Sequence, residues 1–133
     1  MALKFNESII NARLNAIRTA VDAGGGAARI IIYGGTPPAV PGAPTTAQTL
    51  ATLNMAYPSF NDPVNRSITA FAIQSVVASG TGTAGWFRIL TATGSFVADG
   101  TIGLINADMI MPTVDLVAGI TVSVSSMVLT GGN

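Results

Sequence analysis

The chain has 133 residues, among them no cysteine and no histidine, and only 9% of it is charged, with six basic and six acidic residues. An ordinary soluble domain carries about 25% charged residues. The missing residue types exclude disulfide frameworks and thiolate metal sites and remove the commonest general base, and the balanced charge lacks the basic cluster that nucleic-acid binding needs.

The low charge predicts a surface covered mainly by uncharged polar and apolar groups, which suits contact with other protein. A neutral β-domain with a surface rich in Thr and Ser is the plainer interpretation. We expect no nucleic-acid partner and no membrane partner, because no apolar run approaches the roughly 20 residues of a membrane span. Residues 1–17 alternate polar with apolar and do not resemble a signal peptide.

An amphipathic helix is predicted over about residues 7–23. Asn6 is a suitable N-cap, and Glu7 lies favourably at the positive end of the helix dipole. Apolar residues recur at helical spacing, at Ile10, Leu14, Ile17 and Val21. Gly24-Gly25-Gly26 ends the helix, because glycine permits the left-handed backbone that commonly follows a helix.

The β-branched run Ala28–Tyr33 predicts a buried strand. The Pro-rich loop 34–46 follows it, with Pro37 and Pro38 among its four prolines, and cannot pair as a central strand. Two interpretations stay open for this loop. It is either solvated, or an arm that reaches a neighbouring subunit, since proline lowers the entropy lost on ordering.

Two strands are predicted after the loop. In the first, Leu53, Met55 and Tyr57 share the buried face, and the strand stops at Pro58. The second is longer and extends from Arg66 to Val77.

The segment Gly80–Gly85 matches the pattern G-x-G-x-x-G of dinucleotide sites. In such a site the glycines open a helix, whereas here the residues that follow predict a strand. We therefore favour a hairpin connection over a nucleotide loop.

The central strand is predicted over Ala84–Thr91 and is apolar on both sides. Alternation places Phe87 and Ile89 in the core. The opposite face carries Trp86, Arg88 and Leu90.

Arg88 has three possible roles in mid-strand. It can pair with a buried carboxylate, stack on Trp86, or project toward a partner. Because Trp and Arg often anchor protein interfaces, we predict Trp86, Arg88, Leu90, Pro37 and Pro38 as candidate interface residues.

The remaining segments predict further strands. A turn at Thr93-Gly94 leads into a returning strand, Ser95–Ile105, with a bulge at Asp99-Gly100. A short strand, Asp108–Met111, stops at Pro112. The last strand is predicted as one piece, Ile120–Leu129.

Several strands after a single helix predict one domain, 1–133, that is mainly β, as an antiparallel sandwich or barrel. No catalytic residue, metal site or cofactor is expected. The six acids do not cluster, and the single lysine, Lys4, lies in a terminal segment.

Three motifs, in chain order, resemble those of small capsid decoration (cement) proteins of tailed bacteriophages: Asn11–Ile17 (NARLNAI), Ile31–Pro37 (IIYGGTP) and Gly82–Ile89 (GTAGWFRI). A last strand rich in Thr, Ser and Val adds to the resemblance, which covers nearly the whole chain. It implies a β-sandwich of jelly-roll type with one N-terminal helix and no catalytic residue.

The resemblance further implies a structural virion protein, made in the host cytoplasm and carried on the outer capsid surface. It would be a homo-oligomer, dimer or trimer, that binds the major capsid protein across capsomer boundaries. The alternatives are a head-completion or tail-associated virion protein and, from another class, a carbohydrate-binding β-sandwich that stacks sugars on Trp86 and Tyr57.

Overall fold

The structure is a computed structural model that describes residues 3–130. It is mainly β, with one helix and a multi-stranded, mostly antiparallel sheet. The elements in chain order are α1 (Glu7–Asp22), β1 (Arg29–Gly34), β2 (Thr49–Asn54), β3 (Ser67–Thr69), β4 (Val76–Val77), β5 (Gly82–Leu90), β6 (Phe96–Gly103), β7 (Met109–Ile110), β8 (Asp115–Leu116), β9 (Thr121–Val122) and β10 (Ser126–Thr130).

Helix α1 agrees with its prediction to within one residue. The side chain of Asn6 accepts a hydrogen bond from the Ser8 amide at 2.9 Å, so the cap forms as expected. Ile10, Leu14 and Val21 are the buried positions of the helix. Gly25 has φ +76° after the last turn, a backbone conformation that favours glycine.

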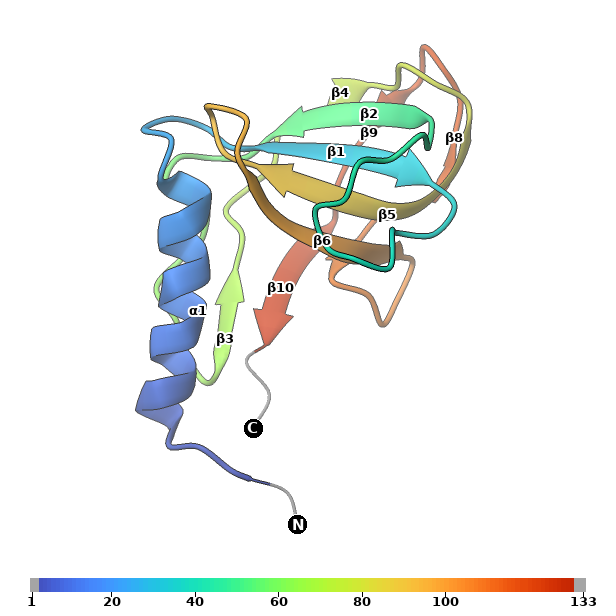
Figure 1. Cartoon of the computed structure of the whole chain (residues 1–133). Helices are drawn as coiled ribbons and strands as arrows, with labels where there is room; N and C mark the ends of the chain where they lie inside the picture. The colour runs from blue at the N-terminus through green and yellow to red at the C-terminus, as the bar shows by residue number, and fades with distance from the viewer. Residues whose placement is uncertain (1–2, 131–133) are drawn as a thin grey trace.

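The sheet order is β2-β1-β5-β6-β7-β10-β3, with β8 also paired to β5 and with β4 and β9 forming a separate pair. All pairs are antiparallel except β6 with β7. Figure 1 shows that α1 and β3 stand side by side and extend away from the strands β2, β1, β5 and β6, whereas the end of β10 reaches toward β3, with which it pairs. We call α1 and β3 the leg and the other strands the body.

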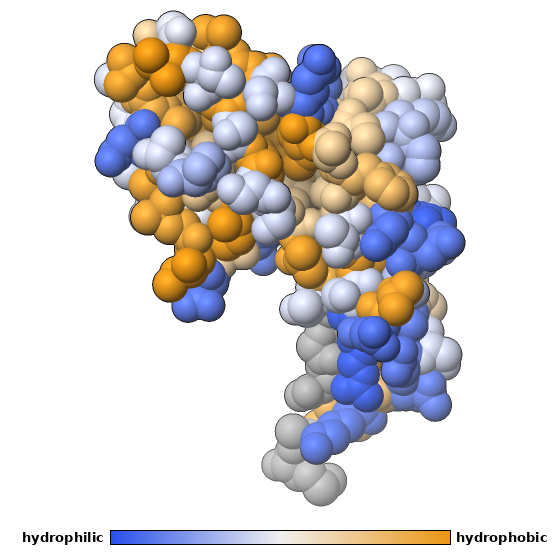
Figure 2. Space-filling model, turned by 180° about the vertical axis from the view of Figure 1, so that it is seen from behind, coloured by the Kyte–Doolittle hydropathy of each residue, from blue (hydrophilic) through white to orange (hydrophobic). Residues whose placement is uncertain are grey.

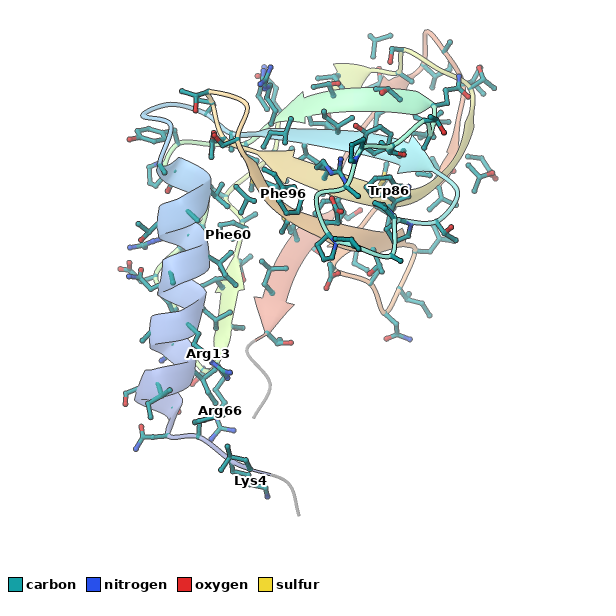
Figure 3. All side chains as sticks on the ribbon, in the orientation of Figure 1. Lys4, Arg13, Phe60, Arg66, Trp86 and Phe96 are labelled. Atoms are coloured by element: carbon teal, nitrogen blue, oxygen red, sulfur yellow. The ribbon has the colours of Figure 1, made fainter. Side chains whose placement is uncertain are left out.

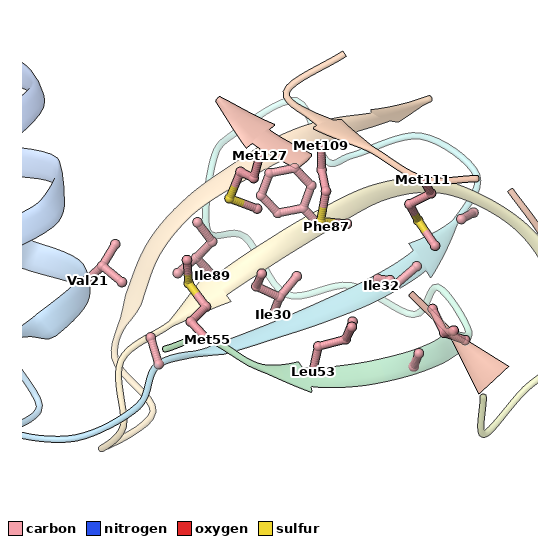
Figure 4. Close-up of a cluster of buried hydrophobic side chains, with 14 of the residues drawn as sticks. Val21, Ile30, Ile32, Leu53, Met55, Phe87, Ile89, Met109, Met111 and Met127 are labelled. Atoms are coloured by element: carbon pink, nitrogen blue, oxygen red, sulfur yellow. The ribbon is translucent and has the colours of Figure 1, made fainter. Parts of the chain in front are cut away.

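The core lies on one face of the main sheet. Phe87 and Ile89 point into it as predicted, together with Ile30 and Ile32 of β1. Four methionines pack against them from β7, β10 and the neighbouring segments, namely Met55, Met109, Met111 and Met127 (Figure 4). Unbranched methionine fills the irregular space between these short strands.

Two predicted strands are each split in two. Arg66–Val77 contains β3 and β4, and Ile120–Leu129 contains β9 and all of β10 except its last residue. The start of the first is also wrong, because Asn65 and Arg66 have positive φ and form a turn. The alternating pattern therefore predicted extended backbone in these segments, but it did not predict where the strands are interrupted.

Three smaller predictions are wrong. Tyr57 is exposed, because β2 already ends at Asn54. The segment before β5 is not a hairpin connection, since β4 pairs with β9 and not with β5.

The predicted bulge at Asp99-Gly100 is absent from β6, and the register instead shifts one residue beside Val97, between the pairs Ile89–Ala98 and Leu90–Phe96. Gly100 has a packing role: a Cβ there would lie 2.4 Å from Cζ of Phe87.

Candidate interaction surface

The second face of the main sheet carries Trp86, Arg88 and Leu90, as the alternation predicts. Trp86 is fully buried, and its ring stacks on Tyr33 of β1 with centroids 4.5 Å apart and planes 22° apart. Its indole N–H donates to the carbonyl of Gly34 at 3.2 Å. The tryptophan therefore ties β5 to β1 within the chain.

Arg88 forms an ion pair with Asp99, which lies directly opposite it on β6. The guanidinium donates from Nε to Oδ1 at 2.7 Å and from Nη2 to Oδ2 at 3.0 Å. Arg88 is only 8% exposed, and its guanidinium carbon lies 5.3 Å from the Trp86 ring centroid and 5.4 Å from that of Phe96. Two of the three predicted roles of Arg88, ion pairing and stacking on Trp86, are confirmed.

This ion pair holds the Pro-rich segment. We call residues 35–48, between β1 and β2, the arm. The carbonyl of Ala43 accepts from Nη2 of Arg88 at 2.9 Å, and the amide of Gly42 donates to Oδ2 of Asp99 at 3.1 Å. The arm crosses this face of the sheet in front of β5 and β6 (Figure 1). It is therefore folded back on its own chain.

Gly42 also packs closely against an aromatic ring. A Cβ at this position would lie 2.8 Å from Cδ2 of Phe96, and the backbone has φ +80°. Figure 3 shows Phe96 and Trp86 on the face that the arm crosses. Only glycine meets both the spatial and the conformational requirement without strain.

The charges of the pair stabilise each other. Burial raises the pKa of the Asp99 carboxyl, but hydrogen bonds from Arg88 and from the Gly42 amide, together with the positive charge of Arg88, outweigh burial and hold that pKa below its usual range. The hydrogen bond to Asp99 raises the pKa of Arg88 against the opposing effect of burial. Both groups are therefore ionised near neutral pH.

The predicted interface residues are thus divided between two layers. Trp86 and Arg88 lie beneath the arm and Leu90 is half-buried, whereas Pro37 is exposed and Pro38 is half-buried on the arm itself. Their role in an interface stays a prediction, and a partner on this side would meet the arm before the strand. Because the ring of Trp86 is covered, it offers no open platform for a sugar.

Asp99 and Gly42 were missed as parts of this site. A plain two-residue turn at Thr93-Gly94 would place Arg88 opposite Asp99. In the structure the turn instead closes between Thr91 and Ser95, and the extra residue at Val97 brings the strands back to that pairing. Gly42 gave no such signal, since its contacts join segments far apart in the sequence.

Charge is distributed unevenly over the molecule. Lys4, Arg13 and Arg66 lie near one end of the leg (Figure 3), and the leg is mostly hydrophilic in Figure 2. In the body, the charges besides the Arg88–Asp99 pair are Arg29 on β1, Asp108 before β7 and Asp115 on β8.

The body also exposes large apolar side chains, and Figure 2 shows hydrophobic surface over much of it. They include Val40, Val77, Leu104, Ile105, Val117 and Ile120. The body therefore carries few charges and is partly apolar outside.

Among residues 3–130, no three potential ligands of the types His, Cys, Asp and Glu come together in a group that could hold a metal ion. In the same range, the helix is too short and too polar to cross a membrane.

Comparison with protein-family models, with curated proteins and with solved structures gave no match for this chain.

Proposed function

We propose that the protein is a structural virion component, a capsid decoration (cement) protein of a tailed bacteriophage. It binds the outer surface of the head, contacts the major capsid protein across capsomer boundaries, and associates with itself as a dimer or trimer. The observation that carries this proposal is the body, which has few charges and exposes large apolar side chains and is therefore suited to wide contact with other protein.

The finer architecture belongs to the same proposal. We place the chain among β-sandwiches of jelly-roll type, with the sheet β2-β1-β5-β6 as one layer and the strands that cover its core face as the other. Support comes from the core, in which Phe87 and Ile89 pack against Met109 and Met127. A protein of this design has its loops free for contact with a lattice.

The stabilising effect would follow from mass action. A protein that binds only the assembled, expanded lattice lowers the free energy of that state by about 2.7 kcal/mol per site when its concentration is 100 times the dissociation constant. Because the sites are repeated over a shell, modest affinity at each is enough to oppose internal DNA pressure.

The arm supplies a surface on which binding can be tested apart from folding. Val40 is 67% exposed on the arm, so Val40→Asp adds a charge without filling the core. Ile9→Asp is the matched control, because Ile9 is 48% exposed but lies on the leg.

Purified expanded shells are mixed with each protein, sedimented, and heated. We expect the wild type and Ile9→Asp to sediment with the shells and to raise their melting temperature, and Val40→Asp to be retained less. Loss of both effects in the wild type would refute the decoration role. Particle images with density at a single vertex would instead favour a head-completion or tail-associated subunit.

A further inference from the structure

The arm covers only part of the second face of the main sheet. Figure 1 shows that it crosses the half of the sheet in which β1 ends, and that it does not cross the half in which β1 begins and β5 ends. On this open half, Arg29 of β1 stands opposite Leu90 of β5 and opposite Asn54 of β2. Directly opposite residues of antiparallel strands share a face, so these three side chains lie on the uncovered part together.

Arg29 and Arg88 share this face, but only Arg88 has an acid partner. Ile31 stands opposite Arg88, and Arg29 lies two residues before Ile31, so alternation puts both arginines on one side of the sheet. Arg88 pairs with Asp99 on the next strand. Within residues 3–130, the Arg29 side chain forms no ion pair and no hydrogen bond. Its charge therefore has no contact partner in a body that carries few charges.

The environment of the Arg29 guanidinium favours an acceptor from outside the chain. Nε is buried and has no partner among residues 3–130, and a buried donor without an acceptor is unfavourable. The residue as a whole is half-buried, and its two terminal nitrogens are not enclosed. Nη2 lies beside the Thr93-Gly94 turn, 3.5 Å from the position that a Cβ of Gly94 would take. A ligand at the surface can therefore reach the terminal nitrogens.

The groups around this charge on the same face are apolar or uncharged. Leu90 and Ile31 are half-buried, whereas Asn54 and Thr52 are exposed and form no side-chain hydrogen bond in the described part of the chain. A charged donor among such groups binds an opposite charge more strongly once a partner excludes water from it. Arginine is accordingly one of the residue types that most often anchor protein interfaces.

We propose that this open half of the face docks on the shell through Arg29, whose guanidinium binds a carboxylate of the major capsid protein. The planar guanidinium matches a carboxylate with two parallel hydrogen bonds. A nucleic acid is a poorer match, because Arg88 is paired, Arg29 is left as a single cation, and binding to nucleic acid needs several. The inference names one contact of the proposed decoration role and rests on that role.

A second copy of the chain is a poor source of this carboxylate. The sixth acid of the chain, Glu7, lies in the first turn of α1, where its charge is favourable to the helix dipole. The other five of the six acids already accept hydrogen bonds within their own subunit, namely Asp22, Asp62, Asp99, Asp108 and Asp115. We therefore expect the acceptor for Arg29 on another protein.

Shell binding tests the anchor. Arg29→Met removes the charge but keeps an unbranched apolar stem, and Arg18→Met is the matched control, because it makes the same change on the leg, where Arg18 pairs with Asp62. We expect Arg29→Met to raise the dissociation constant for purified expanded shells at least about tenfold, and Arg18→Met to bind as the wild type. The urea midpoint of Arg29→Met should equal or exceed that of the wild type, since no contact of the charge within residues 3–130 is lost.

A second variant supplies the missing acceptor from within the chain. Asn54→Asp places a carboxylate directly opposite Arg29, where the two charges can pair. This variant should raise the urea midpoint, and it should weaken shell binding at least about tenfold because Arg29 is then occupied. Ile9→Asp adds the same charge on the leg and should bind as the wild type.

The outcomes separate this inference from the decoration role. A wild type that does not bind shells refutes both, whereas wild-type binding that Arg29→Met and Asn54→Asp leave unchanged overturns the inference alone. Sedimentation velocity of the protein without shells examines the other source of the carboxylate. If Arg29→Met abolishes self-association there, a second copy supplies the carboxylate and the assignment to the capsid protein is wrong.

Discussion

Replacing Asp99 by Asn should release the arm and cost a large part of the folding stability. The substitution preserves the shape of the side chain but removes the charge that accepts three hydrogen bonds, two from Arg88 and one from the Gly42 amide. Arg88 is then left with its positive charge at 8% exposure. Removing one partner of a buried pair costs about 3–5 kcal/mol, a substantial share of the 5–15 kcal/mol typical of a whole domain.

The double variant Arg88→Met/Asp99→Asn measures how strongly the two residues depend on each other. With both charges gone, no buried charge remains uncompensated, so the double variant should lose less stability than the two single variants summed. Groups in one hydrogen-bonded network typically show a coupling energy of about 0.5–3 kcal/mol. Asp115→Asn is the control, because the exposed Asp115 carboxylate accepts a hydrogen bond from the Thr83 hydroxyl and from no other group within residues 3–130, and loss of its charge should change stability by about 0.5 kcal/mol or less.

Trp86 reports on the arm and on folding together, because it is the only tryptophan and lies buried on the face that the arm crosses. Urea unfolding followed by its fluorescence gives the stabilities, and acrylamide quenching in the native state gives access to the ring. We expect Asp99→Asn to increase quenching before unfolding begins. If the stability losses of the single variants add up to that of the double variant, and quenching is unchanged, the view that the pair holds the arm is refuted.

Stability should also depend on pH through Asp99. The pKa of Asp99 is lower in the folded protein than the value of about 3.9 in the unfolded chain. Its contribution to the free energy of unfolding is therefore complete above about pH 4 and disappears as the pH falls through the folded value. The urea midpoints of wild type and Asp99→Asn should converge only in acid, and a constant difference down to about pH 2 would contradict this. Gly42→Ala and Gly35→Ala form a matched pair, because both glycines have φ near +80°, but an added Cβ meets Phe96 at Gly42 and nothing within 4 Å at Gly35. Backbone strain should lower the free energy of unfolding of each variant by about 1–2 kcal/mol. Only Gly42→Ala should lose more stability than this and expose Trp86 to quencher. Equal effects of the two substitutions would show that the ring contact is unimportant.

The parts of the fold that local sequence determines were predictable. The α1 helix needs only its cap, its apolar stripe and the glycines that end it. The hairpin of β5 and β6 turns at Thr93-Gly94 as predicted, where Gly94 has φ +92°, but its register also depends on the extra residue at Val97, which was not predicted. These features depend on contacts between residues close in the chain, so each segment's own residues determine them.

The features that were missed depend on distant segments. The break in Arg66–Val77 follows from a one-residue mismatch with the strand about 50 residues later, and alternation within one segment contains no information about the length of its partner. In the same way, the backbone groups of Gly42 and Ala43 reach Arg88 and Asp99 only after the sheet has formed.

The burial of Trp86 changes which substitution can test binding. Trp and Arg anchor interfaces because they combine a large contact area with hydrogen bonding, and the same properties suit them to hold a segment of their own chain. The arm is such a segment, since it is uncharged and is held through the backbone of Gly42 and Ala43. A charge at Trp86 would therefore unfold the face that holds the arm, and loss of shell binding would then report only lost structure. A charge at Val40 leaves the ion pair intact, so a loss of binding there would identify the outer side of the arm as the contact surface.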